Sequence, residues 1–147
     1  MSEIIKVTVP VETLLPSALE FLKEGMSVVL PVKGNSMIPF IRGGRDQVLV
    51  RKMPAVKEGE VVLAHTTAGN YVIHRIVEAG EDCLVLRGDG NFTGTEKCTL
   101  EGVVGTVTEI QKPSGRKLDP YSVKGWQKLP LFLRRILLAL YKLLFRP

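Results

Sequence analysis

The chain has 147 residues, of which 45% are hydrophobic and 24% are charged, the proportions of an average globular domain. This mixture excludes a disordered tail, a collagen-like repeat and a protein that crosses the membrane many times. A chain of this length buries a core without disulfide bonds or a structural metal. Cys83 and Cys98 lack CxxC spacing, and neither His65 nor His74 stands beside a cysteine, so we expect no metal site.

The net charge of +5 is unevenly distributed along the chain. Residues 1–111 contain 11 Lys and Arg against 14 Asp and Glu, a net charge of −3. Residues 112–147 contain 9 Lys and Arg against Asp119 alone, a net charge of +8. The acidic body offers no surface for a phosphate backbone, so we expect no nucleic acid partner. The basic C-terminal part predicts an anionic partner.

The N-terminal part of the chain predicts one helix and no secretory signal. Residues 1–10 include Glu3 and lack an apolar run, so we expect a cytoplasmic protein. From Glu12 to Lys23 the apolar residues recur with helical spacing, and Gly25 is a natural end for that helix.

Beyond Gly25 the apolar pattern changes to the two-residue period of strands, interrupted by turns rich in Gly, Asn and Asp. The predicted strands are Met26–Val32, Gln47–Lys52, Glu60–His65, Asn70–Glu78, Asp82–Arg87 and Glu101–Gln111. We therefore expect a mostly β, antiparallel domain over residues 1–111, flanked by two helices. Residues 112–125 predict a polar linker, and residues 126–147 a basic C-terminal helix.

This C-terminal helix is amphipathic, with Pro130 in its first turn and Pro147 at its end. At about 100° per residue, the cationic side chains gather on one side: Lys128, Arg134, Arg135, Lys142 and Arg146. The helix is short for a roughly 30 Å hydrocarbon core and carries arginines near its centre, so the free energy of spanning is at best break-even. Two arrangements remain open. The helix lies on an anionic membrane surface, or it docks on the domain or a partner with its cationic stripe in solvent.

Three short stretches of the β body carry residue types suited to catalysis. The first, residues 34–39 (Gly-Asn-Ser-Met-Ile-Pro), follows a strand and exposes the Ser36 hydroxyl at a turn. The second places His74 on the apolar face of a strand, where an imidazole can accept a proton. The third holds Asp89 in a turn between Gly88 and Gly90. Taken singly, they also fit a turn serine, a core histidine and a turn aspartate.

In combination and in this order, the three stretches resemble the signal peptidase and LexA-type serine peptidase superfamily. Gly-x-Ser-Met-x-Pro is similar to its nucleophile box, and His-Arg-Ile-Val and Gly-Asp-x-Asn are similar to the boxes that follow. Residues 46–50 and 59–62 resemble the Val-rich segments between them. The resemblance covers about residues 26–110 and implies that superfamily's coiled, mostly antiparallel β architecture.

The resemblance also implies roles for individual residues. Ser36 is the nucleophile, His74 the general base, and Asp89 the acid that orients the imidazole. Backbone N–H groups at Ser36 and its neighbour Asn35 would meet the oxyanion. The residues that would wall a shallow pocket for the substrate are Met37, Ile38 and Pro39. The implied partner is a peptide or protein bound as an extended strand, with small residues before the scissile bond and no cofactor.

The base position separates this chain from part of the superfamily. Bacterial signal peptidases and self-cleaving repressors have lysine there, whereas the pair His74-Arg75 looks like the ER-type (eukaryotic and archaeal) signal peptidases. Those relatives have a second aspartate a few residues after the first, where this chain has Thr95 and Glu96. The overall layout is closest to small bacterial peptidase-like proteins. A non-cutting peptide-binding module and a self-cleaving regulatory peptidase, with residues 112–124 as its loop, remain alternatives.

Overall fold

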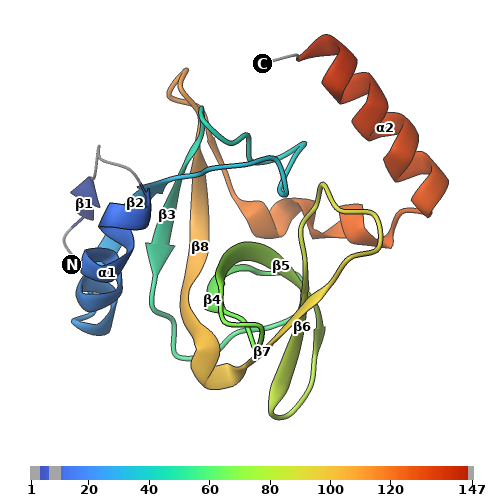
Figure 1. Ribbon diagram of the computed structural model, residues 1–147. Helices are drawn as coiled ribbons and strands as arrows, with labels where there is room; N and C mark the ends of the chain where they lie inside the picture. The colour runs from blue at the N-terminus through green and yellow to red at the C-terminus, as the bar shows by residue number, and fades with distance from the viewer. Residues whose placement is uncertain (1–3, 7–10, 146–147) are drawn as a thin grey trace.

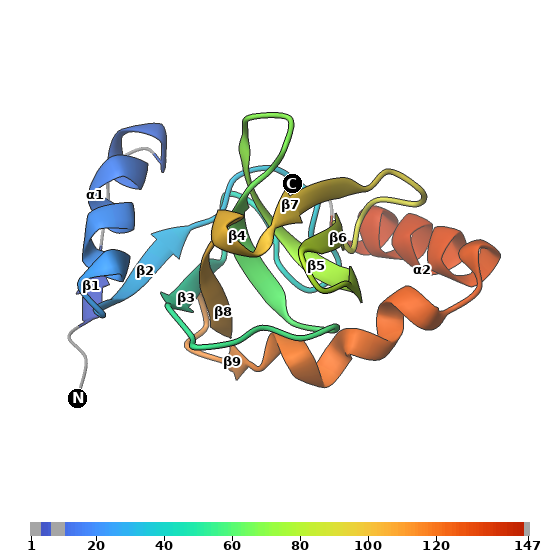
Figure 2. The same cartoon turned by 90° about the horizontal axis from the view of Figure 1, so that it is seen from below.

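The computed structural model describes residues 4–6 and 11–145 and has one sheet between two helices that lie at opposite ends of the molecule (Figures 1 and 2). The N-terminal half contains β1 (Ile4–Lys6), α1 (Val11–Lys23), β2 (Ser27–Pro31), β3 (Gln47–Arg51), β4 (Val61–His65) and β5 (Tyr71–Ala79). The C-terminal half contains β6 (Cys83–Arg87), β7 (Glu96–Thr99), the 3₁₀ helix η1 (Leu100–Gly102), β8 (Val103–Gln111), β9 (Lys117–Leu118), the 3₁₀ helix η2 (Pro120–Lys128) and α2 (Leu131–Leu144).

The predicted mostly β, antiparallel fold with a helix near each end is confirmed. Each of the six predicted strands has a counterpart within a few residues, and α1 occupies the predicted helix. Gly25 follows α1 with φ +84°, a conformation that glycine adopts without strain. The short strands β1, β7 and β9 were not predicted from the sequence. In β7, Cys98 is the single apolar residue, so its pairing with β6 rather than its pattern defines the strand.

The sheet has the strand order β1-β2-β3-β8-β4-β5-β6-β7, and β9 pairs with β8. Among the described strands, the β1–β2 pair is parallel and the others are antiparallel. Register shifts interrupt the β3–β8, β4–β8 and β5–β6 ladders. Such irregularities increase strand twist, and the sheet coils around β4 and β5 (Figure 1). As a result both faces of β5 are covered, and His74 and Arg75 are both buried although they point to opposite faces.

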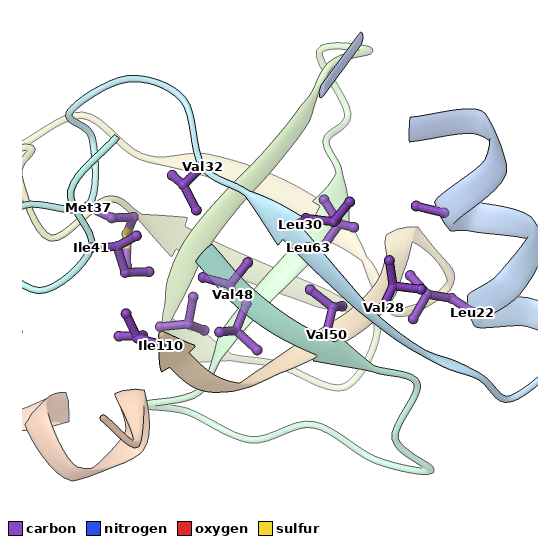
Figure 3. Close-up of a cluster of buried hydrophobic side chains, with 13 residues drawn as sticks. Leu22, Val28, Leu30, Val32, Met37, Ile41, Val48, Val50, Leu63 and Ile110 are labelled. Carbon is purple, nitrogen blue, oxygen red and sulfur yellow. The ribbon is translucent and has the colours of Figure 1, made fainter. Parts of the chain in front are cut away.

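The main hydrophobic core extends from α1 through the coiled sheet to Met37 and Ile41 in the turn after β2 (Figure 3). Leu22 of α1 packs against Val28 and Leu30 of β2, and Val48 and Val50 of β3 belong to the same buried cluster. A second cluster fills the space among β4, β5, β6 and β7. Together these cores fix the strands from which the candidate site is built.

Residues 112–125, for which the sequence predicts a polar linker, form β9 and most of η2 and pack on the body. Residues 112–118 close a hairpin onto β8 through β9, and Lys112 donates to Asp46 over 2.6 Å. The next residues form η2, which Asp119 caps and whose Trp126 is buried. The chain is extended at Leu129, so the C-terminal helix begins at Leu131 rather than near residue 126.

Helix α2 docks on the body through a narrow face. Leu138 is buried in a cluster with Ile38 and Trp126, and Tyr141 packs at its edge. Arg134, predicted to lie in a solvent-facing stripe, is buried here, with its guanidinium 3.3 to 3.5 Å from backbone carbonyls. Burial, reinforced by the nearby charge of Arg87, lowers the pKa of Arg134.

Candidate active site

Two of the predicted residues meet at hydrogen-bond distance. Ser36 lies in the turn after β2, and His74 lies in β5 with its ring buried. His74 Nε2 is 3.0 Å from Ser36 Oγ, although the residues are 38 positions apart in the chain. The pairing of β5 with β4, together with the core that holds β2, brings them together. A hydroxyl and an imidazole at this distance have the geometry of a nucleophile and its base.

The opposite side of the His74 ring is occupied by Glu96, the first residue of β7. Glu96 Oε1 contacts His74 Nδ1. Because an ionised carboxylate accepts hydrogen bonds and donates none, Nδ1 must carry the proton of this pair. In the neutral ring the lone pair is then on Nε2, where it faces the Ser36 hydroxyl. The contact with Glu96 therefore fixes the tautomer that can accept the proton of Ser36.

Asp89, predicted to orient His74, lies elsewhere. Its two carboxylate oxygens accept from Arg75 Nε and Nη2 over 2.9 and 2.7 Å, and the side chains are 0% and 1% exposed. Gln127 Nε2 donates to the same carboxylate over 2.9 Å. The prediction for Asp89 is therefore corrected. The Asp89 carboxylate accepts hydrogen bonds from Arg75 and Gln127, and Glu96 is the carboxylate that contacts the imidazole.

The buried pair of Asp89 and Arg75 connects the loop after β6 to η2. Arg75 Nη1 also donates to the carbonyls of Gly59 and Pro120, over 2.9 and 2.7 Å. Trp126 Nε1 donates to the backbone carbonyl of Asp89 over 2.8 Å. Every charged atom of the pair thus has a partner, which a buried ion pair needs if it is not to destabilise the fold. Asp89 positions a loop rather than the catalytic ring.

That loop packs directly on the turn that carries Ser36. Gly90 N–H donates to the Ser36 carbonyl over 2.8 Å, and Asp89 N–H lies 3.3 Å from Met37 Sδ. A Cβ at Gly88 would lie 2.2 Å from the Ser36 carbonyl oxygen and 3.1 Å from His74 Nε2. A glycine is therefore required at position 88, because a side chain would displace the nucleophile turn from the base.

A groove of about 370 Å³ leads to Ser36 and His74. Its lining is mostly apolar and comes from α1, the end of β2, β4 and the start of β5: Leu15, Leu30, Pro31, Val32, Lys33, Ser36, Met37, Leu63, Tyr71, Val72, Ile73 and His74. The β1 ladder on β2 ends at Val29, and the β6 ladder on β5 begins at Arg75. Among the described strands, none pairs with the groove-facing edges of residues 30–32 and 71–74. The groove therefore lies beside residues 30–32 and 71–74, all of which line it.

The other predicted site residues are divided between two sides of the nucleophile turn. Met37 lines the groove, as the sequence predicted. Ile38 is buried against Trp126 and Leu138 of the α2 interface, because the turn reverses direction after Met37. Pro39 is half-buried and is not among the groove-lining residues. Asn35 lines a different hollow, beside α2.

The fold and this arrangement of serine and histidine place the chain in the LexA/signal peptidase superfamily, as its sequence pattern indicated. The chain belongs to the Peptidase S24-like family, whose model matches residues 3–107. That is a family of serine peptidases. The match includes Ser36, His74 and Glu96, and ends before η2 and α2. No curated protein matches the chain significantly.

The described residues contain neither a membrane-spanning helix nor a cluster of metal ligands. No helix over residues 11–145 is both long and apolar enough to cross a membrane. Within the same part of the chain, no group of three or more His, Cys, Asp and Glu side chains is arranged to hold a metal ion.

Proposed function

We propose that the protein is a serine endopeptidase that cleaves an extended peptide, with Ser36 as nucleophile and His74 as general base. The observation that carries this proposal is the 3.0 Å distance from His74 Nε2 to Ser36 Oγ in a chain of a serine peptidase family. The use of histidine instead of lysine as the base is similar to the ER-type signal peptidases.

The reaction follows from this geometry in two stages. Ser36 Oγ attacks the carbonyl carbon of the scissile bond while its proton passes to His74 Nε2. The tetrahedral intermediate breaks its C–N bond as the imidazolium returns that proton to the leaving amine, which leaves an ester on Ser36. Water, deprotonated by the same nitrogen, then attacks the ester and releases the acid and the free hydroxyl of Ser36.

Glu96 and the backbone of the nucleophile turn stabilise the charges that develop. Glu96 holds Nδ1–H and lies against the imidazolium when the ring is doubly protonated, a role that a buried carboxylate plays in other serine peptidases. The amide N–H groups of Ser36 and Asn35 are the proposed donors to the oxyanion. Losing one such donor typically costs about 3–4 kcal/mol of transition-state stabilisation.

The position of the groove beside two strands supports an extended peptide as the substrate. A segment lying between residues 30–32 and 71–74 can form backbone hydrogen bonds to both edges, which is how strand addition binds peptides. Met37 and Leu63 line the groove beside Ser36 and are almost fully buried. We propose small residues before the scissile bond, as the resemblance to the superfamily implies.

Peptide cleavage followed by mass spectrometry tests the proposal. The full-length protein is incubated with peptides from a digested proteome, and the new termini that arise are identified. We expect new termini preceded by small residues, and none with the Ser36→Ala protein. If the wild-type protein produces no new terminus but both proteins bind peptides equally well, the protein is a peptide-binding module instead.

Self-cleavage is tested by the intact mass of the protein after long incubation. Residues 112–124 are the candidate loop, and they form the β8–β9 hairpin and the start of η2. A scissile bond there would have to leave this structure to reach Ser36. We therefore expect an unchanged mass.

A further inference from the structure

The outward side of α2 is a continuous apolar surface. Six of its side chains are each 43% to 73% exposed: Phe132, Ile136, Leu137, Leu140, Leu143 and Leu144. At about 100° per residue they fall on one arc, opposite the docked residues Arg134 and Leu138. Isolated exposed leucines are common on proteins, but a surface formed by one side of a whole helix marks an interaction site.

The charges around this surface are of one sign. Residues 126–147 contain five Lys and Arg and no Asp or Glu. Arg135 and Lys142 are exposed and lie on the polar side of α2, between the apolar arc and the docked Leu138. The Arg135 guanidinium lies 4.9 Å from the centroid of the Phe92 ring. An amphipathic helix with Lys and Arg on its polar side and Leu and Phe on the other is suited to the interface of an anionic membrane.

The inner face of α2 removes the main obstacle to lying on lipid. Arg134, in the first turn of α2, points into the body, where its guanidinium is within 3.5 Å of the carbonyls of Asn91 and Phe92. Its charge therefore does not have to enter the hydrocarbon. Docking also orients the helix, because Leu138 and Tyr141 hold one side against Ile38 and Trp126. The apolar side is held outward.

A second copy of the chain is a poorer occupant for this surface. Two α2 helices packed through their apolar faces would leave their Arg and Lys side chains without an acidic partner on either helix. A membrane with anionic lipids meets both requirements, since it offers hydrocarbon for the leucines and negative charge for the basic side chains.

We propose that the outward face of α2 binds the surface of an anionic membrane, with the helix parallel to the bilayer and its inner face still docked on the body. Ile38 lies two residues after Ser36 and packs against Leu138 of α2. The nucleophile turn is then separated from the lipid by the thickness of one helix, about 10 Å. The site acts on peptide segments close to the membrane surface.

Vesicle co-sedimentation of the full-length protein tests this inference. The vesicles contain phosphatidylcholine alone or phosphatidylcholine mixed with phosphatidylglycerol. The variant Leu140→Glu/Leu143→Glu places two charges on the outward face at exposed positions. The matched control is Met53→Glu/Leu100→Glu, which replaces two exposed apolar residues of the body that are far from α2 in the chain. Circular dichroism melts check that both variants are folded.

We expect wild-type protein to sediment with the anionic vesicles and less with the neutral ones. Leu140→Glu/Leu143→Glu should reduce the partition coefficient by more than about tenfold, because two exposed leucines that would enter the hydrocarbon are replaced by charges. The control and Ser36→Ala should bind as the wild type does, so this result is independent of the proposed peptidase activity. Lys142→Gln should lower the partition coefficient by a smaller factor, and only with the anionic vesicles.

Three results would overturn the inference. The first is wild-type protein that stays in the supernatant with anionic vesicles. The second is equal binding by Leu140→Glu/Leu143→Glu and its control. The third is sedimentation velocity without lipid that shows a wild-type dimer and a monomeric Leu140→Glu/Leu143→Glu variant, which would assign the face to a second copy.

Discussion

Glu96 contacts Nδ1 of His74 on the edge of the ring opposite Ser36, and the three side chains form a line from carboxylate to hydroxyl. They come from β7, β5 and the turn after β2, so the line exists only when the sheet is coiled. Glu96 follows Asp89 by seven residues, and the Asp89 carboxylate pairs with Arg75 instead of the imidazole.

Replacing Glu96 should impair the site without unfolding the protein. Glu96→Gln removes the negative charge, and its amide can donate to Nδ1, which favours the tautomer that cannot accept from Ser36. We expect the rate of fluorophosphonate labelling at Ser36 to fall by about 10²–10⁴-fold. The control is Glu101→Gln, an exposed carboxylate in η1, which should label at the wild-type rate. Equal rates for the two variants would remove Glu96 from the site.

Breaking the buried ion pair should cost stability. Arg75→Met leaves the Asp89 carboxylate buried without its charged partner, and we expect the free energy of unfolding to fall by about 3–5 kcal/mol. The double variant Arg75→Met/Asp89→Leu removes both charges and should recover part of that loss. Urea unfolding followed by circular dichroism measures both. A single variant as stable as the wild type would show that the pair does not hold the loop to η2.

The contact between Gly88 and the nucleophile turn gives a steric prediction. In Gly88→Ala the new Cβ would meet the Ser36 carbonyl oxygen at 2.2 Å, so the turn must move. A displacement of about 1 Å typically lowers a catalysed rate by about 10²-fold, and we expect a loss of that size in Ser36 labelling. Gly94→Ala in the same loop has open space around its Cβ and should label normally. The idea fails if the two variants label alike.

The two cysteines should react at very different rates. Burial raises the pKa of Cys98, and the nearby charge of Cys83 acts in the same direction, whereas Cys83 is exposed. With a disulfide reagent at mildly alkaline pH, we expect one thiol to react quickly and the second after denaturation, because the thiolate is the reactive form. Two fast thiols in the native protein would contradict the burial of Cys98.

The raised pKa of Cys98 makes the free energy of unfolding depend on pH. Since the native pKa of Cys98 is above its unfolded value, the stabilisation from its buried neutral thiol is fully present below about pH 8.5. It is lost as the pH rises from there towards the native pKa. Replacing Cys98 with alanine should therefore flatten the decline of unfolding free energy above that pH, while Cys83→Ala should change it less.

Most of the fold could be predicted from local patterns. The six alternating or apolar runs became β2, β3, β4, β5, β6 and β8, and helical spacing identified α1. The local patterns did not predict β7, because its sequence Glu-Lys-Cys-Thr has only one apolar residue. These residues form a strand because they pair with β6. Long-range pairing of this kind has no local signal.

Two of the three residues of the candidate site could be predicted from the sequence. The order of motifs identified Ser36 and His74, which meet at 3.0 Å. It could not decide which carboxylate reaches the imidazole, because that depends on where the β6–β7 pairing places Glu96. Arg75 points to the opposite face of β5 from its neighbour His74 and takes Asp89 instead. For α2, the sequence predicted an apolar face and a cationic face. Which side of the helix packs on the body depends on the carbonyls of Asn91 and Phe92, which accept from Arg134.

The reactivity of Ser36 towards a fluorophosphonate, mapped by mass spectrometry in wild-type protein and in His74→Ala, measures most directly whether the hydroxyl and the imidazole work as a couple. We predict one adduct per chain, located on Ser36, and a labelling rate lower by about 10²–10⁴-fold without the imidazole. No adduct on Ser36, or an adduct that forms equally fast in His74→Ala, would contradict the proposed role of the pair.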